Sequence, residues 1–209
     1  MSFNRRSRRD SRRDSRRRQS SKKYEEEAIV LEVISPDMNR RRGKYSDAHI
    51  LQVVGTSWFT LLEIIPEDPN VIMLGDAIKL GKDERNKIKT IIGRIGYDDL
   101  TRVAELQLDE TIDLILEKYE EKFVTWLNKS TPISLRLHSL HLIKGIGPKS
   151  LTKILNERKV RDFESYEDFE ERTGVSHIKS LIKQRILDEL TDPDEKHYLF
   201  TRSYSKDRR

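Results

Sequence analysis

The spacing of hydrophobic residues changes near residue 100 of this chain. Before that point, short apolar runs rich in β-branched residues are separated by Gly, Pro and charged residues, as in strands joined by turns. We expect strands at residues 28–34, 48–54, 58–65, within 71–80 and at 87–95. After residue 100, apolar residues recur every three or four positions, which is the period of an amphipathic helix. The pattern predicts an α+β protein whose sheet precedes its helices.

Helix boundaries in the second half follow from residues that start or stop helices. Residues 101–129 are predicted to form one linking amphipathic helix, with Asp109 as its N-cap. Four shorter helices follow up to residue 190, separated by Gly and Pro. They are expected to begin at Thr131-Pro132, at Pro148, at Ser165 and at Ser176, the last two residues being N-caps.

The turn between the first two of these helices has the features of a phosphate-binding site. Gly145 can adopt the left-handed conformation that ends a helix, and Pro148 favours the start of the next. Gly147 leaves room for another backbone, and Ile146 is expected to point into the core. The first N–H groups of the second helix then face outward with the positive end of the helix dipole, and lysines add charge. The predicted phosphate site consists of Lys144, Gly145, Ile146, Gly147, Lys149 and Ser150.

This turn resembles the helix-hairpin-helix motif, whose two helices flank a hydrophobic–Gly–hydrophobic–Gly turn. Proteins with this motif bind the sugar-phosphate backbone of nucleic acids without reading the bases, and the resemblance implies the same here. Residues 163–190 resemble a second, degenerate copy in which Ser176 replaces the second glycine. We expect this copy to be mainly structural. The alternative for the first copy is that it only ends one helix and starts the next.

The five short strands, with a long first loop and glycine-rich turns, fit a small barrel of the OB type. OB barrels bind oligonucleotides on the face of strands 2 and 3 and with their first and last inter-strand loops. Tyr45, Trp58 and Phe59 could supply rings for base stacking, but Trp58 and Phe59 are adjacent, so one of them should be core. The loop residues expected to contact nucleic acid are Arg40, Arg41, Arg42, Lys44, Tyr45, Lys82, Arg85 and Lys87.

The positive charge of the chain is concentrated at its N-terminus. The formal net charge is +5, but residues 1–23 hold eleven basic and two acidic residues, which leaves −4 for the remainder. This first segment has too few apolar residues to fold, and we expect a disordered basic arm that binds nucleic acid. A solubility tail is the alternative. The arginines of the arm are Arg5, Arg6, Arg8, Arg9, Arg12, Arg13, Arg16, Arg17 and Arg18.

Several classes of protein are not indicated. The chain has no cysteine, which excludes disulfides and thiolate metal sites and is compatible with a reducing cytoplasm. No apolar run is long enough to span a membrane, and the arginine-rich N-terminus lacks the apolar stretch of a secretory signal. We therefore expect neither a membrane partner nor secretion.

Residues with possible chemistry do not form a recognisable catalytic site. His138 and His141 have a spacing that can bind zinc, but no third ligand is in view. The segment 147–150 has Pro148 inside the Gly-Lys-Ser core of a P-loop and lacks that motif's first glycine. We expect no catalytic residue, metal, cofactor or small-molecule substrate.

The whole pattern resembles an uncharacterised archaeal family, the domain of unknown function 655 (DUF655) proteins. The resemblance covers residues 24–195 and rests on Ala28–Ile34, Ser46–Leu51, Gly75–Gly81 and Leu140–Leu155. It implies an OB-type barrel followed by tandem helix-hairpin-helix motifs. The genes of such proteins tend to lie near genes for a ribosomal protein, an RNA polymerase subunit and a ribosomal RNA dimethyltransferase, which implies a role with RNA or the ribosome.

We therefore expect an N-terminal five-stranded OB-like β-barrel followed by an all-α tandem helix-hairpin-helix domain. The predicted segments are a basic arm (1–23), the barrel (24–100), a linking helix (101–129), the tandem hairpins (130–192) and a C-terminal tail (193–209). The leading hypothesis is a non-catalytic cytoplasmic protein that binds RNA, in particular ribosomal RNA or the ribosome. The alternatives are a DNA-binding protein of repair or transcription and an adaptor that binds other proteins.

Overall fold

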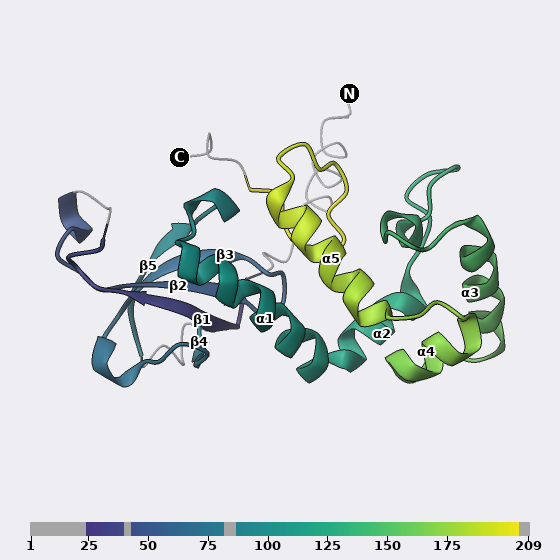
Figure 1. The fold of residues 1–209 in the computed structure, drawn as a ribbon, viewed down its shortest axis with the longest axis horizontal. Helices are drawn as coiled ribbons and strands as arrows, with labels where there is room; N and C mark the ends of the chain where they lie inside the picture. Colours follow the sequence, from purple (N-terminus) through teal and green to yellow (C-terminus); the bar gives the residue numbers. More distant parts are fainter. Residues whose placement is uncertain (1–23, 40–42, 82–86, 205–209) are drawn as a thin grey trace, which may run out of the picture.

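The computed structural model describes residues 24–39, 43–81 and 87–204. Within them, five antiparallel strands form one curled sheet in the order β4-β1-β2-β3-β5 (Figure 1). The strands are β1 (Glu27–Ile34), β2 (Ile50–Gly55), β3 (Leu61–Pro66), β4 (Ala77–Lys79) and β5 (Ile88–Arg94). Helices pack against this sheet and extend away from it, so the α+β class expected from the sequence is confirmed.

Irregular pairing and an apolar inner face explain the curl of the sheet. Pairing shifts register between Val30 and Glu32 in β1 and between Glu63 and Ile64 in β3, and such bulges increase the local twist. One face of the sheet buries a hydrophobic cluster of its own. Its members are Ala28, Val30, Leu51, Val53, Leu62, Ile64, Ile72, Ile78, Leu80 and Ile88.

The third and fourth strands are shorter than predicted. The third begins three residues late because the backbone turns at Phe59, whose φ of 49° lies in the left-handed region. The carboxylate of Glu25 holds this turn by accepting hydrogen bonds from the backbone N–H groups of Ser57, Trp58 and Thr60. The fourth predicted region contributes only a three-residue strand, β4.

The segment predicted as one linking helix contains two helices, so that prediction was wrong in its boundaries. The α-helices of the described residues are α1 (Arg102–Lys118), α2 (Glu120–Lys129), α3 (Pro148–Val160), α4 (Tyr166–Thr173) and α5 (Ile178–Thr191). Tyr119 (φ −115°, ψ 34°) separates α1 from α2. The N-cap of α1 is Thr101 rather than Asp109, because the Thr101 hydroxyl accepts a hydrogen bond from the N–H of Ala104.

The helix predicted to begin at Thr131-Pro132 does not form. Residues 131–138 make a loop that closes through a bridge between Pro132 and His138, and only a 3-10 turn, Ser139–Leu142, precedes the Gly145 turn. The first hairpin therefore has one short arm.

The other helix starts are mostly as predicted. The Ser165 cap is confirmed, because its hydroxyl accepts a hydrogen bond from the N–H of Asp168. The cap predicted at Ser176 is wrong, because His177, with a φ of 59°, directly precedes α5 and provides no capping side chain. Because His177 lies between Ser176 and the first residue of α5, the serine is one position too far from the helix to cap it.

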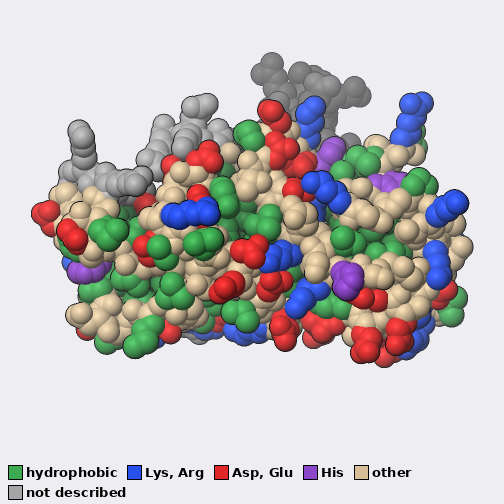
Figure 2. Space-filling model, viewed as in Figure 1, with side chains coloured by type: hydrophobic (Ala, Val, Ile, Leu, Met, Phe, Trp, Pro, Cys, Tyr) green, Lys and Arg blue, Asp and Glu red, His purple; other side chains and the backbone are tan. Residues whose placement is uncertain are grey.

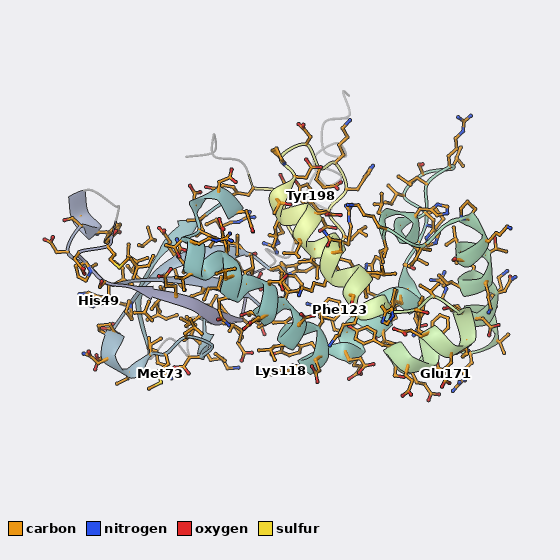
Figure 3. All side chains as sticks on the ribbon, viewed as in Figure 1. His49, Met73, Lys118, Phe123, Glu171 and Tyr198 are labelled. Atoms are coloured by element: carbon orange, nitrogen blue, oxygen red, sulfur yellow. The ribbon has the colours of Figure 1, made fainter. Side chains whose placement is uncertain are left out.

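The outer face of the sheet and all five helices share one hydrophobic cluster. Phe123 of α2 lies in the middle of the molecule (Figure 3), with its ring centroid 6.2 Å from that of Phe59 and 5.9 Å from that of Phe200. Phe200 belongs to the segment predicted as a tail but is only 5% exposed. The C-terminal segment is therefore part of the core.

A buried carboxylate anchors this C-terminal segment. Glu189 of α5 accepts hydrogen bonds from the backbone N–H groups of Leu199, Phe200 and Thr201, and it forms an ion pair with Arg185 at 2.9 Å. Because one side chain satisfies three consecutive residues, the chain is held against α5 without forming a strand.

Candidate nucleic-acid interface

The predicted phosphate-binding turn has the expected backbone. Gly145 has a φ of +99°, Ile146 is 3% exposed, and Gly147 is the N-cap of α3 with extended φ and ψ (−83°, 179°). Pro148 occupies the first helical position, where its missing N–H costs nothing. Both glycines and Lys149 are exposed.

The two glycines of this turn have different reasons to be glycine. A Cβ on Gly145 would lie 3.3 Å from Leu181 Cδ1 of α5, and its positive φ already disfavours other residues. A Cβ on Gly147 would meet nothing within 4 Å, and its backbone conformation is open to any residue. The fold therefore requires Gly145, whereas Gly147 only keeps the space in front of α3 clear.

The first turn of α3 presents unused hydrogen-bond donors in that space. Leu151 donates its N–H to the carbonyl of Gly147. The N–H groups of Lys149 and Ser150 have no acceptor within the described part of the chain. The Lys149 side chain is in no ion pair with the described residues, whereas Lys144 pairs with Asp188 of α5 at 2.8 Å. Lys149 is thus the more available of the two lysines.

The ion pair with Lys144 also changes the pKa of Asp188. Burial of Asp188 acts to raise its pKa, but the hydrogen bonds from Lys144 and Gln184 outweigh burial and lower the pKa. Lys144 therefore has a structural partner that the sequence did not reveal, although its side chain remains 73% exposed.

The turn at Gly174 has a similar backbone, but a carboxylate lies at the start of the helix that follows it. Gly174 has a φ of +73° and Val175 is buried, as in the first turn. Here the first N–H of the following helix, from Ile178, donates to Glu170 Oε1 at 2.8 Å. A carboxylate of the chain itself thus lies at the positive end of the α5 dipole, where the first hairpin has open space.

The helix after the first turn is mainly basic, whereas the helix before the second turn is mainly acidic. Helix α3 carries four basic residues and one acidic residue, whereas α4 carries four acidic residues and one basic residue. Figure 2 shows the acidic side chains along the lower edge, over α4, and basic side chains above them, toward α3 and the loop before it. A polyanion would approach the α3 side.

Most of the predicted barrel-loop residues and all of the arm arginines lie outside the described residues. The loop residues outside are Arg40, Arg41, Arg42, Lys82 and Arg85. Lys44, Tyr45 and Lys87 are described, and the ammonium of Lys44 lies 5.4 Å from the centroid of the half-buried Tyr45 ring. The loop that holds Tyr45 is at the opposite end of the long axis from α3 (Figure 1). The two predicted surfaces are therefore not brought together.

The outer face of strands 2 and 3 is covered, contrary to what oligonucleotide binding there needs. Gln52 of β2 donates a hydrogen bond to the carbonyl of Asp99 and accepts one from the N–H of Thr101. Every residue of β2 is buried. Phe59 is fully buried and Trp58 is partly exposed, so the expectation that one of these adjacent rings belongs to the core is confirmed, and Phe59 is not available for stacking.

The histidine pair has a structural explanation. His138 Nδ1 accepts a hydrogen bond from the N–H of Leu140, and burial lowers the pKa of His138, which favours the neutral ring. Among the residues that the structure describes, no three His, Cys, Asp or Glu side chains lie close enough together to hold a metal ion. No helix in the described ranges is both long and apolar enough to cross a bilayer.

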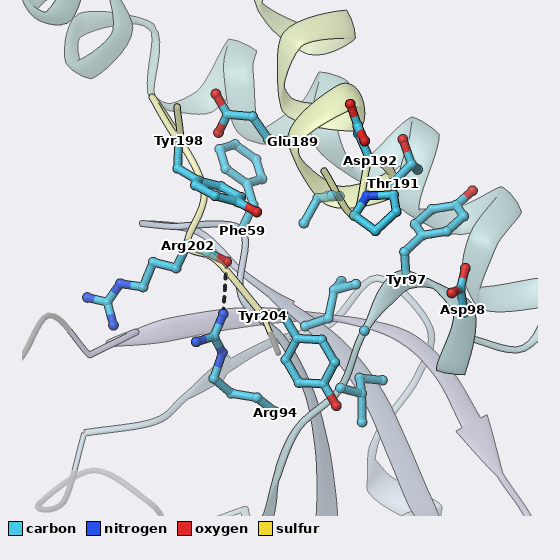
Figure 4. Close-up of a pocket in the computed structure, with 15 residues that line it drawn as sticks. Phe59, Arg94, Tyr97, Asp98, Glu189, Thr191, Asp192, Tyr198, Arg202 and Tyr204 are labelled. Carbon is cyan, nitrogen blue, oxygen red and sulfur yellow. Dashed lines mark hydrogen bonds between the residues drawn. The ribbon is translucent and has the colours of Figure 1, made fainter. Parts of the chain in front are cut away.

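Sequence reasoning did not single out Arg94 and Arg202. These arginines flank a pocket of about 280 Å³ between the end of β5, the end of α5 and residues 198–204 (Figure 4). They are 108 positions apart, so no spacing pattern could connect them. The available signal was an isolated arginine at the end of an apolar strand and an aromatic-rich C-terminus.

Comparison with known proteins identifies the family but no activity. The family described as "Protein of unknown function (DUF655)" matches residues 24–202. An uncharacterized protein of Methanocaldococcus jannaschii is 39% identical over 158 residues, covering 75% of this chain and 72% of that protein. The crystal structure of Af1531 from Archaeoglobus fulgidus superposes with a TM-score of 0.74 at 35% identity, covering 85% of this chain and 100% of that one. This chain therefore belongs to the DUF655 family of proteins of unknown function.

Proposed function

We propose that this protein binds RNA without catalysis, and that the Gly145–Gly147 turn and the first turn of α3 hold a backbone phosphate. The observation that carries the proposal is the open space at Gly147, beside the first turn of α3, where the N–H groups of Lys149 and Ser150 have no acceptors in the described chain. A phosphate there would meet the positive end of the helix dipole and the Lys149 ammonium.

The contrast between the hairpins supports this assignment. In the second hairpin, Glu170 already accepts the first helical N–H, so a phosphate would have to displace or repel a carboxylate. At the start of α3, no carboxylate from the described residues accepts a backbone N–H in this way. The proposal therefore assigns backbone binding to the first hairpin and a packing role to the second.

The finer fold assignments belong to the same proposal. We assign the Gly145 and Gly174 turns with their helices to two helix-hairpin-helix motifs, the first with a shortened leading arm. We assign the sheet to a partly open OB barrel, because its order leaves β4 and β5 as free edges. The covered outer face of β2 means that such a barrel would use its loops, including Tyr45, rather than its sheet face.

RNA is favoured over DNA by the aromatic side chains rather than by the phosphate site. A helix N-terminus contacts only the backbone and cannot distinguish the two polymers. Tyr45 and Trp58 are partly exposed rings, which suit the splayed bases of single-stranded or looped RNA better than stacked duplex bases. Residues 1–23 would add sequence-independent affinity.

The test is a binding titration of the full chain by fluorescence anisotropy, with structured RNA and duplex DNA at one salt concentration. Lys149→Ala should weaken RNA binding by about 1.5–3 kcal/mol on every RNA sequence, because it removes a charge-assisted contact. Gly147→Val should weaken it more, because its side chain fills the phosphate space. Lys159→Ala, which changes an exposed lysine at the other end of α3, is the control and should bind like the parent.

Two results would contradict this function. If folded Lys149→Ala and Gly147→Val proteins bind RNA like the parent, the turn is a packing element. If duplex DNA binds more tightly than structured RNA, the protein is a DNA-binding rather than an RNA-binding protein. Failure to bind either polymer would favour the adaptor hypothesis.

A further inference from the structure

A pocket lined by two arginines and three acidic residues lies between the sheet and the C-terminal segment. Figure 4 shows Arg94 and Arg202 together at one end of this pocket, with Tyr204 beside Arg94. Phe59 and Leu190 contribute apolar surface. The volume of about 280 Å³ is at the small end of the range for ligand pockets.

The two guanidinium groups have unused donors that are shielded from solvent. Arg94 Nη2 donates to the carbonyl of Arg202 at 3.0 Å, but Arg94 Nε and Arg202 Nη2 are buried and have no hydrogen-bond partner among the described residues. Neither arginine forms an ion pair with a described residue. Arg172 and Arg185, which are also largely covered, each pair with two carboxylates.

Such an arrangement is costly unless an anion completes it. A buried donor without an acceptor loses its hydration without compensation, and two neighbouring cations repel each other. Burial and the charge of Arg202 both lower the pKa of Arg94, which means that the charged form of Arg94 is less stable here than in water. A phosphate has enough oxygen acceptors to serve both arginines at once.

The surroundings suit more than a bare phosphate. The Arg202 guanidinium carbon lies 5.2 Å from the centroid of the Trp58 ring, and that of Arg94 lies 5.8 Å from the Tyr204 ring. Figure 4 places Asp98 and Asp192 on the other side of the pocket. Carboxylates there can accept hydrogen bonds from ribose hydroxyls or from the amino group of a base.

We infer that this pocket binds a phosphorylated nucleoside, with its phosphate on Arg94 and Arg202 and its sugar or base against the aromatic rings and carboxylates. The ligand chemistry is the same for a free mononucleotide and for the 5′-phosphorylated end of an RNA strand. The site shares no residue with the Gly145 turn and extends beyond the function proposed above.

The experiment is calorimetric titration of the full chain with AMP, adenosine, inorganic phosphate and a 5′-phosphorylated octaribonucleotide. AMP or the octaribonucleotide should bind at least about tenfold more tightly than adenosine or phosphate alone. Arg202→Gln should remove at least that factor. Arg136→Gln, at an exposed arginine in the loop before α3 and outside the pocket, should leave AMP binding unchanged. Arg94→Lys keeps the charge but not the Nε donor, and should weaken binding while leaving thermal unfolding unchanged.

The variants separate this inference from the proposed function. If AMP binds, the pocket takes free nucleotides; if only the octaribonucleotide does, it takes RNA ends. The inference is wrong if Arg202→Gln, shown to be folded, leaves both affinities unchanged, or if inorganic phosphate binds as tightly as AMP and the octaribonucleotide. Loss of octaribonucleotide binding in Lys149→Ala but not in Arg202→Gln would mean that the pocket does not bind RNA ends and would leave the hairpin site standing. Loss of octaribonucleotide binding in Arg202→Gln but not in Lys149→Ala would overturn the hairpin site and leave the pocket standing.

Discussion

At the scale of single residues, the two glycines of the first hairpin turn separate structural from functional constraint. Gly145 is fixed by its backbone conformation and by Leu181, whereas Gly147 has an ordinary conformation and empty space beside it. A residue type that the fold does not require is informative, because its presence points to something outside the chain. The sequence analysis had assigned a left-handed conformation to Gly145 and room for another backbone to Gly147, and the structure is consistent with both expectations.

A pair of alanine substitutions tests this difference. Gly145→Ala should lower the free energy of unfolding by about 1–2 kcal/mol, the usual cost of a left-handed non-glycine residue plus a close contact. Gly147→Ala should leave stability within about 0.5 kcal/mol of the parent. Urea unfolding monitored by Trp58 and Trp126 fluorescence measures both. Equal destabilisation by the two changes would show that Gly147 is also structural.

At the scale of elements, helix boundaries depend on contacts that the local sequence does not contain. Thr101 caps α1 and its hydroxyl also hydrogen-bonds to Glu32 of β1, 69 positions away. Asp109, which looked like a cap, instead pairs with Lys183 of α5 at 2.7 Å. The cap of α1 is thus fixed by the sheet.

Substitutions at the two candidate caps should differ in effect. Thr101→Ala should cost about 1–2 kcal/mol of stability, because it removes the cap and the contact with β1. Asp109→Ala should cost no more than about 1 kcal/mol, since it removes one exposed ion pair. Thermal unfolding of the two variants decides which residue begins α1, and a larger loss for Asp109→Ala would favour the sequence-based boundary.

The junction of β1 with α1 and α2 should be sensitive to pH. A hydrogen bond from the Tyr119 hydroxyl, at 2.6 Å, is the main cause of the lowered pKa of Glu27, and Lys118 and Lys79 also contribute. Because the folded pKa is below the unfolded value of 4.5, this stabilisation is complete above that value and is lost as the pH falls through the folded pKa.

Glu27→Gln should therefore lower stability by about 1 kcal/mol at pH 7. The difference from the parent should shrink steadily below pH 4.5, where the parent carboxylate begins to be protonated. The matched control is Glu26→Gln, which removes a neighbouring exposed carboxylate and should leave stability at pH 7 unchanged. Chemical unfolding of the three proteins between pH 3 and pH 7 measures the effect, which is absent if Glu27 and Tyr119 do not interact.

Sequence patterns correctly predicted the turns and helix starts that depend on the conformational preference of one residue. The Gly145 turn, the Pro148 start and the Ser165 cap were found because each depends on the conformational preference of one residue. The loop at 131–138 was mistaken for a helix because its conformation depends on distant contacts. Arg158 of α3, for example, donates to the carbonyls of Leu127 and Ser130 and so fixes the chain just before that loop.

At the scale of the whole molecule, the sheet and the helices do not form independent units. Phe200 should show this most clearly, because it contacts Phe123 and Trp126 within the shared cluster. Phe200→Ala should destabilise the protein by about 3–5 kcal/mol. It should also lower the unfolding temperature of sheet and helices together in a single transition, measured by circular dichroism. Leu135→Ala, at a fully exposed side chain, should have no effect; separate transitions would contradict a shared core.

The N-terminal basic segment affects the charge of the whole molecule, because its positive charge exceeds the net negative charge of the remaining residues. Removing residues 1–23 should reduce the steepness of the log–log salt dependence of RNA binding by about 3–5, if half of the eleven basic residues release counterions. Titrations at four salt concentrations give the slope. An unchanged slope would mean that this segment does not touch the RNA.

The packing of the C-terminal segment has a consequence for biosynthesis. During translation residues 199–201 emerge after the sheet and the helices, yet Phe200 packs in the cluster around Phe123, and Glu189 accepts hydrogen bonds from the backbone N–H groups of Leu199 to Thr201. A nascent chain can form the sheet and most helices earlier, as segments do when they emerge in order. Its central core closes only after Phe200 has emerged, so a polypeptide cut off before Leu199 would expose that core.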